Sequence, residues 1–331
     1  MKKLLLCICC MLLLAGCAPT EPAPERDDGR LRIVATVFPA YDFARAAAGD
    51  RADVTLLLPP GVESHSYEPT PADILAVQNC DLFIYLGGES DAWVDTILTA
   101  VQPRGETLRM VDCVDLLEEE HVEGMQEERG HDHDHHEDEH EPHEELEDGH
   151  GLGEVTGMDE HVWTSPANAA AITLSIGEKL AELDGTHGET YRKNAEGYAA
   201  ELMDLDRQFE VFFDAQPSRT IVFGDRFPLR YFAERYDLDY YAAFPGCGTQ
   251  TEPSAATIAY LTEKVRTEQL PTVWYIEFSN HLVADCIAEA TETRTAMFHT
   301  CHNVSKAEIE SGATYLSLME GNLETLQQYF T

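Results

Sequence analysis

Residues 189–215 read ETYRKNAEGYAAELMDLDRQFEVFFDA and carry one apolar stripe. The apolar side chains recur at alternating spacings of four and three residues, which places them on one face of an α-helix. They are Tyr191, Ala195, Tyr198, Leu202, Leu205, Phe209 and Phe212. At 1.5 Å per residue, such a helix is about 40 Å long, roughly the dimension of a whole lobe. Pro217 ends it, so the pattern predicts a long helix between two parts of the chain.

Short apolar segments precede this helix and are separated by helical patterns. Strands are expected at 31–37, 53–58, 81–86 and 107–111, and helices at 72–79, 92–101 and 166–183. Short apolar strands that alternate with helices are typical of an α/β lobe with a parallel sheet.

A second set of the same kind follows the long helix. Strands are expected at 220–223, 240–244, 272–277 and 295–299, and helices at 253–268, 281–290 and 305–329. The predicted fold class is therefore α/β, with two lobes of small, mostly parallel sheets flanked by helices and joined by one long rigid helix. We expect an N-terminal lobe at 31–165, a helical linker at 166–216 and a C-terminal lobe at 217–331.

The N-terminus has the features of an export signal. Two lysines precede a short apolar stretch, Leu4 to Leu14, and the sequence LAGC at 14–17 resembles the lipobox of bacterial lipoproteins. That resemblance implies cleavage before Cys17 and a lipid on its sulfur, with residues 1–17 as the signal and 18–30 as a tether. The alternative is an ordinary signal peptide with an incidental cysteine. On the lipoprotein interpretation, the body is anchored to the outer face of the cell membrane, or to its periplasmic side, and does not cross it.

The composition is strongly acidic, with 22 Lys and Arg against 61 Asp and Glu and a net charge of −39. Phosphate contacts need Lys and Arg, so nucleic acid is an improbable partner. Such a surface would instead concentrate cations. A monomer is expected.

Residues 118–150 are rich in histidine and acid and almost lack aliphatic side chains. This segment cannot bury enough apolar area to offset its ordering entropy, so a disordered loop is predicted. Its imidazoles and carboxylates could hold metal ions weakly; those in the candidate auxiliary site are His131, His133, His135, His136, His140 and His143. Residues 136–140 also match the zinc-peptidase pattern H-E-x-x-H, but this pattern works only on a packed helix.

Two histidines outside that loop have distinctive settings. His65 lies in GVESHSYEP at 61–69, after a predicted strand, and His161 lies in DEHVWTSP at 159–166, before a predicted helix. Ligands in α/β folds bind near the carboxyl ends of strands. A single such histidine is more often structural than a ligand, so the spacing alone leaves both roles open.

These two segments, the His/acid loop between them and the long helix after them resemble the substrate-binding lipoproteins of zinc and manganese ABC importers (cluster A-I). The resemblance covers nearly all of residues 31–331. It implies two α/β lobes with one metal ion in the cleft, no catalysis, and permease and ATPase subunits as partners. It carries over His65 and His161 as metal ligands from the first lobe.

The second lobe departs from the family pattern. In FGDRFPLRYF at 223–232, Gly224 stands where the family places a ligand, and the family's last ligand aligns best with His299 in MFHTCHN at 297–303. The expected ligands are therefore His299 or His302 or both, with Asp225 or Glu277 completing the shell. A site of three or four imidazoles suits Zn²⁺, although other divalent transition metals remain possible.

Two cysteines lie near these segments. If the protein is exported, Cys301 could pair with Cys247 and clamp two cleft loops; free buried thiols are the alternative. The function predicted by the whole sequence is capture of zinc and delivery to an ABC permease. The alternatives are a surface-anchored metal buffer and, less consistent with the sequence, a zinc hydrolase.

Overall fold

The computed structural model describes residues 29–64, 67–88, 91–125, 157–246 and 252–330. The chain divides into two units, residues 1–30 and residues 31–331, and the fold below is that of the second unit. None of the helices formed by the described residues is both long and apolar enough to cross a membrane.

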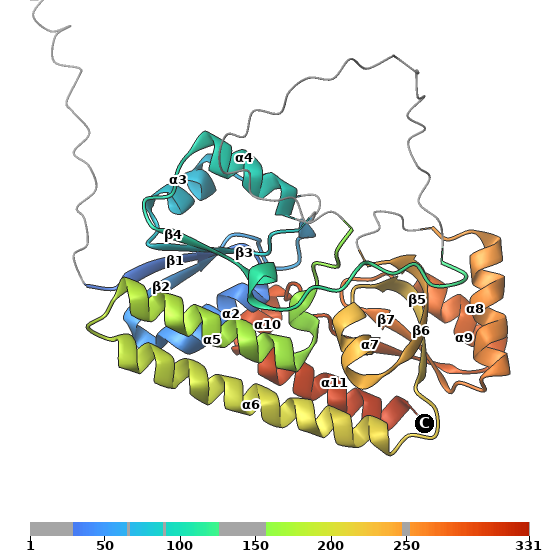
Figure 1. Cartoon of the computed structure of the whole chain (residues 1–331). Helices are drawn as coiled ribbons and strands as arrows, with labels where there is room; N and C mark the ends of the chain where they lie inside the picture. Colours follow the sequence, from blue (N-terminus) through green and yellow to red (C-terminus); the bar gives the residue numbers. More distant parts are fainter. Residues whose placement is uncertain (1–28, 65–66, 89–90, 126–156, 247–251, 331) are drawn as a thin grey trace, which may run out of the picture. The chain divides into compact units, whose positions relative to one another are not determined.

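The first half of this unit is a four-stranded parallel sheet with the strand order β2-β1-β3-β4 (Figure 1). Its faces are both covered. Leu82 and Ile84 on β3 join the core that includes α2, whereas Phe83 and Tyr85 pack with side chains of α3 and α4. Its elements are β1 (Leu31–Ala35), α2 (Phe38–Ala48), β2 (Ala52–Leu56), α3 (Pro71–Asn79), β3 (Leu82–Tyr85), α4 (Ala92–Ala100) and β4 (Glu106–Arg109), with short 3₁₀ turns η1 (Gly49–Arg51) and η4 (Met110–Cys113).

The second half repeats this arrangement, with a parallel sheet of order β6-β5-β7-β8. The pairing of β5 with β6 shifts register between Phe223 and Arg226, which changes the course of β5 near its carboxyl end. The elements are β5 (Thr220–Phe227), α7 (Arg230–Tyr236), β6 (Asp239–Pro245), α8 (Ala255–Thr267), β7 (Thr272–Ile276), α9 (Leu282–Thr291), β8 (Arg294–Phe298), α10 (Lys306–Ser311) and α11 (Tyr315–Tyr329).

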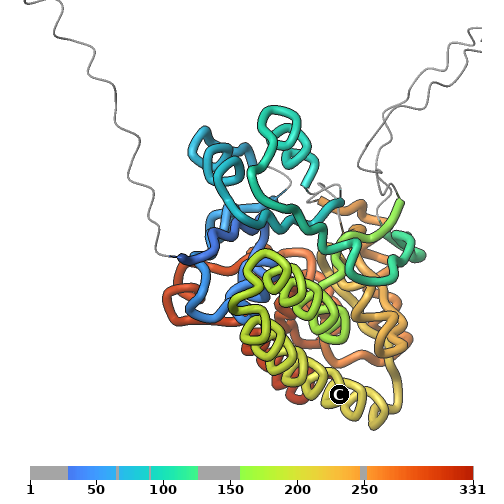
Figure 2. Tube along the Cα trace, turned by 60° about the vertical axis from the view of Figure 1, so that its left-hand side comes forward, coloured from blue at the N-terminus to red at the C-terminus, as the bar shows by residue number. Residues whose placement is uncertain are grey.

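The long helix α6 (Gly188–Asp214) contacts both halves. It packs along α5 (Pro166–Leu183), which follows the 3₁₀ turn η5 (Val162–Thr164), and Figure 2 shows these two helices side by side in yellow-green, with α11 in red next to them. Near its start, Asn194 donates to the Ala47 carbonyl at the end of α2. Near its end, the buried Asp206 accepts from Arg235 and from the Tyr236 hydroxyl on α7. The predicted fold class is confirmed, and α6 spans the two sheets as the apolar stripe indicates.

The structure corrects several sequence expectations. The helices α2 and α7 were not predicted, and the single helix expected at 305–329 is two helices, α10 and α11. They are separated because Gly312 adopts a left-handed φ of 81° and Thr314 caps α11. Residues 118–125, expected in the disordered loop, include a bridge between Glu118 and Met158 and a hydrogen bond from the Tyr240 hydroxyl to Glu120.

Candidate metal centre

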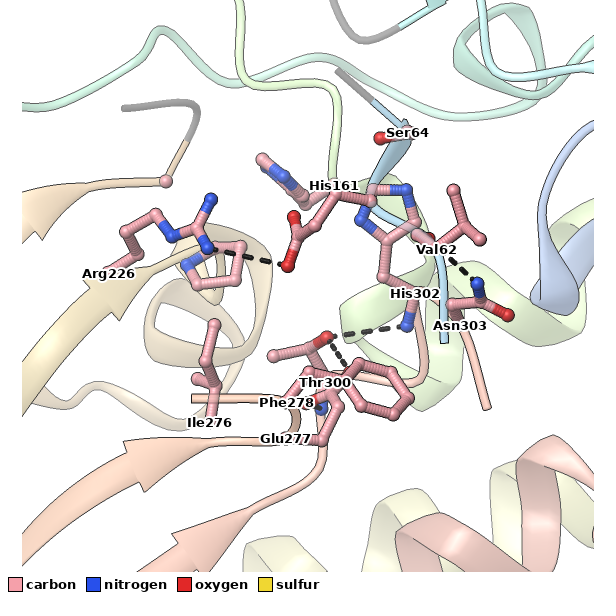
Figure 3. A pocket seen from close by; sticks show the side chains of 13 residues that line it. Val62, Ser64, His161, Arg226, Ile276, Glu277, Phe278, Thr300, His302 and Asn303 are labelled. Carbon is pink, nitrogen blue, oxygen red and sulfur yellow. Dashed lines mark hydrogen bonds and ion pairs between the residues drawn. The ribbon is translucent and has the colours of Figure 1, made fainter. Parts of the chain in front are cut away.

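The carboxyl ends of strands from both sheets converge on one small cavity. Its volume is about 40 Å³, enough for a water-sized species but far below the roughly 300–1,000 Å³ of sites for organic ligands. The cavity therefore fits an ion rather than a small molecule. The residues that line it are Val62, Glu63, Ser64, His161, Arg226, Pro228, Gly246, Ile276, Glu277, Phe278, Thr300, His302 and Asn303 (Figure 3).

His161 enters the cavity from the segment before η5, and its orientation is fixed by Asp159. One oxygen of this carboxylate accepts from the His161 backbone N–H at 2.8 Å and lies 3.0 Å from its Nδ1. A carboxylate partner assigns the imidazole proton to Nδ1 and leaves the Nε2 lone pair available. A histidine ring held by a carboxylate in this way is the usual arrangement of a metal ligand.

The charge around His161 favours protons as well as cations. Burial by itself lowers the pKa of the imidazole, but Asp159, Glu160 and Glu119 together raise it above the ordinary 6.5. Protons therefore compete for Nε2 at a higher pH than they would for an unperturbed histidine.

His302 comes from the loop that follows β8. Cys301 has a left-handed φ of 61°, and on either side of it Thr300 and His302 both line the cavity. The ring centroids of His302 and His161 are 6.3 Å apart and nearly perpendicular, with the Trp163 ring 5.2 Å from His302. Figure 3 shows the two imidazoles close together at the cavity. One imidazole thus comes from each half of the protein.

His299 has a different position, outside the described wall of the cavity. Its Nδ1 accepts from the Cys301 backbone N–H at 2.9 Å, and its Nε2 lies 3.6 Å from a Glu308 oxygen. Asn322 on α11 holds its backbone through hydrogen bonds to both its N–H and its carbonyl, each 2.7 Å. His299 therefore positions the loop, and of the two candidates it is His302 that faces the cavity.

The two candidate carboxylates also have structural partners. Glu277 lines the cavity, but its oxygens accept from the Thr300 N–H at 2.7 Å and from the Thr300 hydroxyl at 2.5 Å. Asp225 accepts from the backbone N–H groups of Arg226 and Ile276, at 2.8 and 3.3 Å. Each carboxylate stabilises backbone next to the cavity: Glu277 fixes the loop that carries His302, and Asp225 joins β5 to β7.

Gly224 has no room for a side chain. A Cβ atom built there would lie 2.4 Å from the Cα atom of Ala284 on α9, so an imidazole at this position would require the helix to move. The charged side chains that β5 and the first-half loop bring to the cavity are Arg226 and Glu63, which were not among the residues predicted from the sequence. Glu63 lies in the quoted GVESHSYEP motif, and Arg226 is two residues after Gly224. However, a single glutamate or arginine in a sequence does not by itself indicate a position that lines a cavity.

Hydrogen bonds join the loops from the two halves. The Asn303 amide donates to the carbonyls of Pro59 and Val62, at 2.8 and 2.9 Å, and the Gly61 N–H donates to the Val304 carbonyl at 2.9 Å. The Trp163 indole donates to the Thr300 carbonyl at 2.9 Å. The loop before His65 and the loop that carries His302 are therefore tied directly to each other.

Other predicted site residues lie outside the described residues, namely His65, Cys17, Cys247 and the loop histidines His131, His133, His135, His136, His140 and His143. Within the described ranges, no group of three His, Cys, Asp or Glu side chains is arranged to hold a metal ion. Cys301 has no disulfide partner among these residues; its thiol is buried in the core and burial raises its pKa well above the ordinary value. The pairing of Cys301 with Cys247 stays a prediction, because Cys247 lies outside the described residues.

Comparison with known proteins shows the family to which this chain belongs. Residues 33–329 match the model of the family described as zinc-uptake complex component A, periplasmic, or ZnuA. The chain belongs to the ZnuA family. The resemblance found in the sequence motifs is thereby confirmed.

Similar proteins and structures agree with this family. The zinc-binding lipoprotein AdcA of Streptococcus pneumoniae is 31% identical over 99% of this chain, which spans 61% of that protein's length. The high-affinity zinc uptake system protein ZnuA of Bacillus subtilis is 29% identical, over 96% of this chain and 94% of that protein. The Zn(II)-bound ZnuA-like domain of S. pneumoniae AdcA matches with a TM-score of 0.70 and 26% identity, covering 91% of this chain and 99% of the domain. The metal-dependent lipoprotein YcdH of B. subtilis gives a TM-score of 0.72 at 26% identity, covering 91% and 100%.

Proposed function

We propose that this chain captures Zn²⁺ in the cavity between its two sheets and delivers it to the permease of an ABC importer. The observation that carries the proposal is the convergence of His161 and His302, one from each half, on a cavity sized for an ion. Neutral imidazoles are preferred ligands of Zn²⁺. The relatives, a zinc-binding lipoprotein and a zinc uptake protein, support the same ion.

The proposal assigns His65 as a third imidazole. His65 directly follows Ser64, which lines the cavity, and the adjoining loop at 59–62 is joined to the His302 loop by hydrogen bonds. Three imidazoles leave one position of a tetrahedral zinc shell for water or a further donor. The ion is cargo here: binding is reversible, and the proposal includes no reaction on it.

The location of the protein belongs to the same proposal. Cys17 would carry the lipid and hold the folded unit on the outer face of the membrane; the similarity to the lipoprotein AdcA supports this location. Permease and ATPase subunits would then be its partners in import.

Uptake of radioactive zinc by the source cells tests delivery. In zinc-limited medium, cells that lack this protein should regain uptake when the wild-type chain is restored but not when His161→Ala is restored. Uptake should also disappear when the permease of the zinc importer in these cells is deleted. Zinc retention at the cell surface that depends on this protein but not on any permease would instead establish a metal buffer.

A further inference from the structure

A positively charged side chain lines the cavity proposed for a cation. Arg226, near the carboxyl end of β5, extends to Glu63 of the first-half loop, and the guanidinium Nη2 lies 3.5 Å from the Glu63 carboxylate (Figure 3). The Arg226 side chain is 22% exposed and that of Glu63 is 48% exposed. The pair therefore joins the two halves across the wall of the cavity.

The backbone of Arg226 is held in place independently of this ion pair. Asp225 accepts from the Arg226 N–H and from the N–H of Ile276 on β7. Arg226 also pairs with Phe244 in the β5–β6 register, after the shift that follows Phe223. The carboxyl end of β5 is thus a fixed base from which this side chain reaches the first half.

A guanidinium beside a cation site has an electrostatic consequence. Arginine stays charged at all physiological pH values and repels a divalent ion close to it. Here its charge is matched by Glu63, so this part of the wall is electroneutral, and the carboxylate is engaged by an arginine. The other ionisable side chains in the described wall are the imidazoles of His161 and His302 and the Glu277 carboxylate, whose two oxygens already accept hydrogen bonds from Thr300.

We propose that Arg226 is a specificity-determining residue, which restrains Glu63 and so keeps the metal site rich in neutral nitrogen donors. This inference rests on the proposed function. Zn²⁺ binds strongly to imidazole, whereas Mn²⁺ depends more on carboxylate and other oxygen donors. Because Arg226 forms an ion pair with the Glu63 carboxylate, it weakens the binding of Mn²⁺ more than the binding of Zn²⁺.

The variant Arg226→Gln tests this role in the full chain. It removes the charge but keeps a polar side chain, and a half-exposed ion pair contributes little to folding stability. Competition with a fluorescent chelator should show a rise of about tenfold or more in Mn²⁺ affinity, with a smaller change for Zn²⁺. The Zn²⁺ to Mn²⁺ affinity ratio should fall accordingly.

Two further variants identify the cause. Glu63→Gln combined with Arg226→Gln restores a neutral wall without a carboxylate, and the affinity ratio should return close to the wild-type value. Arg230→Gln is the matched control, because Arg230 lies four residues along the chain and pairs with Glu120 and Glu234, outside the cavity wall. It should leave both affinities unchanged.

The outcomes separate this inference from the proposed function. Failure of the wild-type chain to bind Zn²⁺ tightly would reject the proposed function itself. A wild-type chain that binds Zn²⁺, together with an Arg226→Gln variant of unchanged affinity ratio, would overturn only the role of Arg226. A double variant that still shows the ratio of Arg226→Gln would overturn it as well, because the effect would not depend on Glu63.

Discussion

His299 and His302 are only three residues apart, yet His302 lines the cavity whereas His299 is buried outside its described wall. The left-handed backbone of Cys301 lies between them, and His299 uses its Nδ1 to accept from the Cys301 N–H. Sequence patterns give no indication of this turn, because Cys301 is not a residue type that favours positive φ. The choice between the two histidines therefore needed the structure.

This difference predicts opposite results for the two histidines. On the proposed function His302 is itself a ligand, so His302→Ala should weaken zinc binding beyond the ~10–100-fold loss that is typical when a residue supporting a ligand is changed. His299→Asn should lower the melting temperature but keep a tight site. Isothermal titration of both variants, with circular dichroism as the folding control, makes the comparison. Tight binding retained by His302→Ala and lost by a folded His299→Asn would reverse the assignment.

Acid should release the metal earlier than an unperturbed histidine site would. The surrounding carboxylates outweigh burial and raise the pKa of His161, so its protonated form already competes above about pH 6.5. In the metal-free protein the same raised pKa favours the folded state below the unfolded pKa, and this contribution disappears as the pH rises through the folded pKa. Zinc affinity and this contribution to metal-free stability thus change in opposite directions.

Titration of zinc binding between pH 8 and pH 5 measures this effect. As the pH is lowered from 8, zinc affinity should already decrease before about pH 6.5 is reached and should decrease further at lower pH. If several imidazoles bind the ion, more than one proton should be taken up for each ion released. Affinity that stays constant down to about pH 5 would show that carboxylates hold the ion instead.

At the scale of elements, the strands and the long helix were accessible to sequence reasoning, whereas some helices were not. Buried parallel strands are short apolar runs with clear ends, and α6 has a regular polar face. In contrast, α2 is largely buried and carries few polar side chains to mark a period, and α7 has only seven residues. The candidate site was predicted as a group of loops, but which side chains enter the cavity depends on contacts between distant segments, such as Asn303 with Val62.

Asn303 should be important for the site although it carries no charge. Replacing it with Ala removes the donors to the carbonyls of Pro59 and Val62 and leaves both acceptors without that partner, at a cost of about 1–3 kcal/mol in the free energy of unfolding. Because these bonds connect the loop at 59–62 with the loop that carries His302, the proposed site should lose zinc affinity by about tenfold or more. Chemical denaturation and zinc titration of the same preparation measure both effects. Unchanged affinity in a destabilised variant would limit Asn303 to a folding role.

At the scale of the whole molecule, we predict that the proposed tight zinc site is separable from the acidic, histidine-rich segment. The cavity wall belongs to the folded unit, whereas 16 acidic residues are concentrated at 118–148. Residues 118–125 contact the second sheet through Glu120 and Tyr240, so a deletion should begin after them. A chain without residues 126–150 should lose weak metal sites only and keep its tight zinc site. Zinc titration and metal analysis of this deletion would contradict the separation if tight binding disappeared with the segment.

The long helix α6 supports the arrangement of the two halves around the candidate metal centre. It is bonded to α2 through Asn194 and to α7 through Asp206, while loop contacts such as that of Asn303 with Pro59 join the two halves at the cavity. The two imidazoles are therefore supported by contacts on both sides of the cavity, and such preorganised ligands favour tight binding.

Anomalous diffraction from crystals of the zinc-loaded chain, recorded on both sides of the zinc absorption edge, tests the central claim most directly. The account predicts one strong zinc peak in the cavity, about 2.0–2.1 Å from Nε2 of His161 and from Nε2 of His302. A zinc peak between His299 and Glu308, or a zinc-loaded structure in which His161 and His302 both point away from the ion, would contradict it.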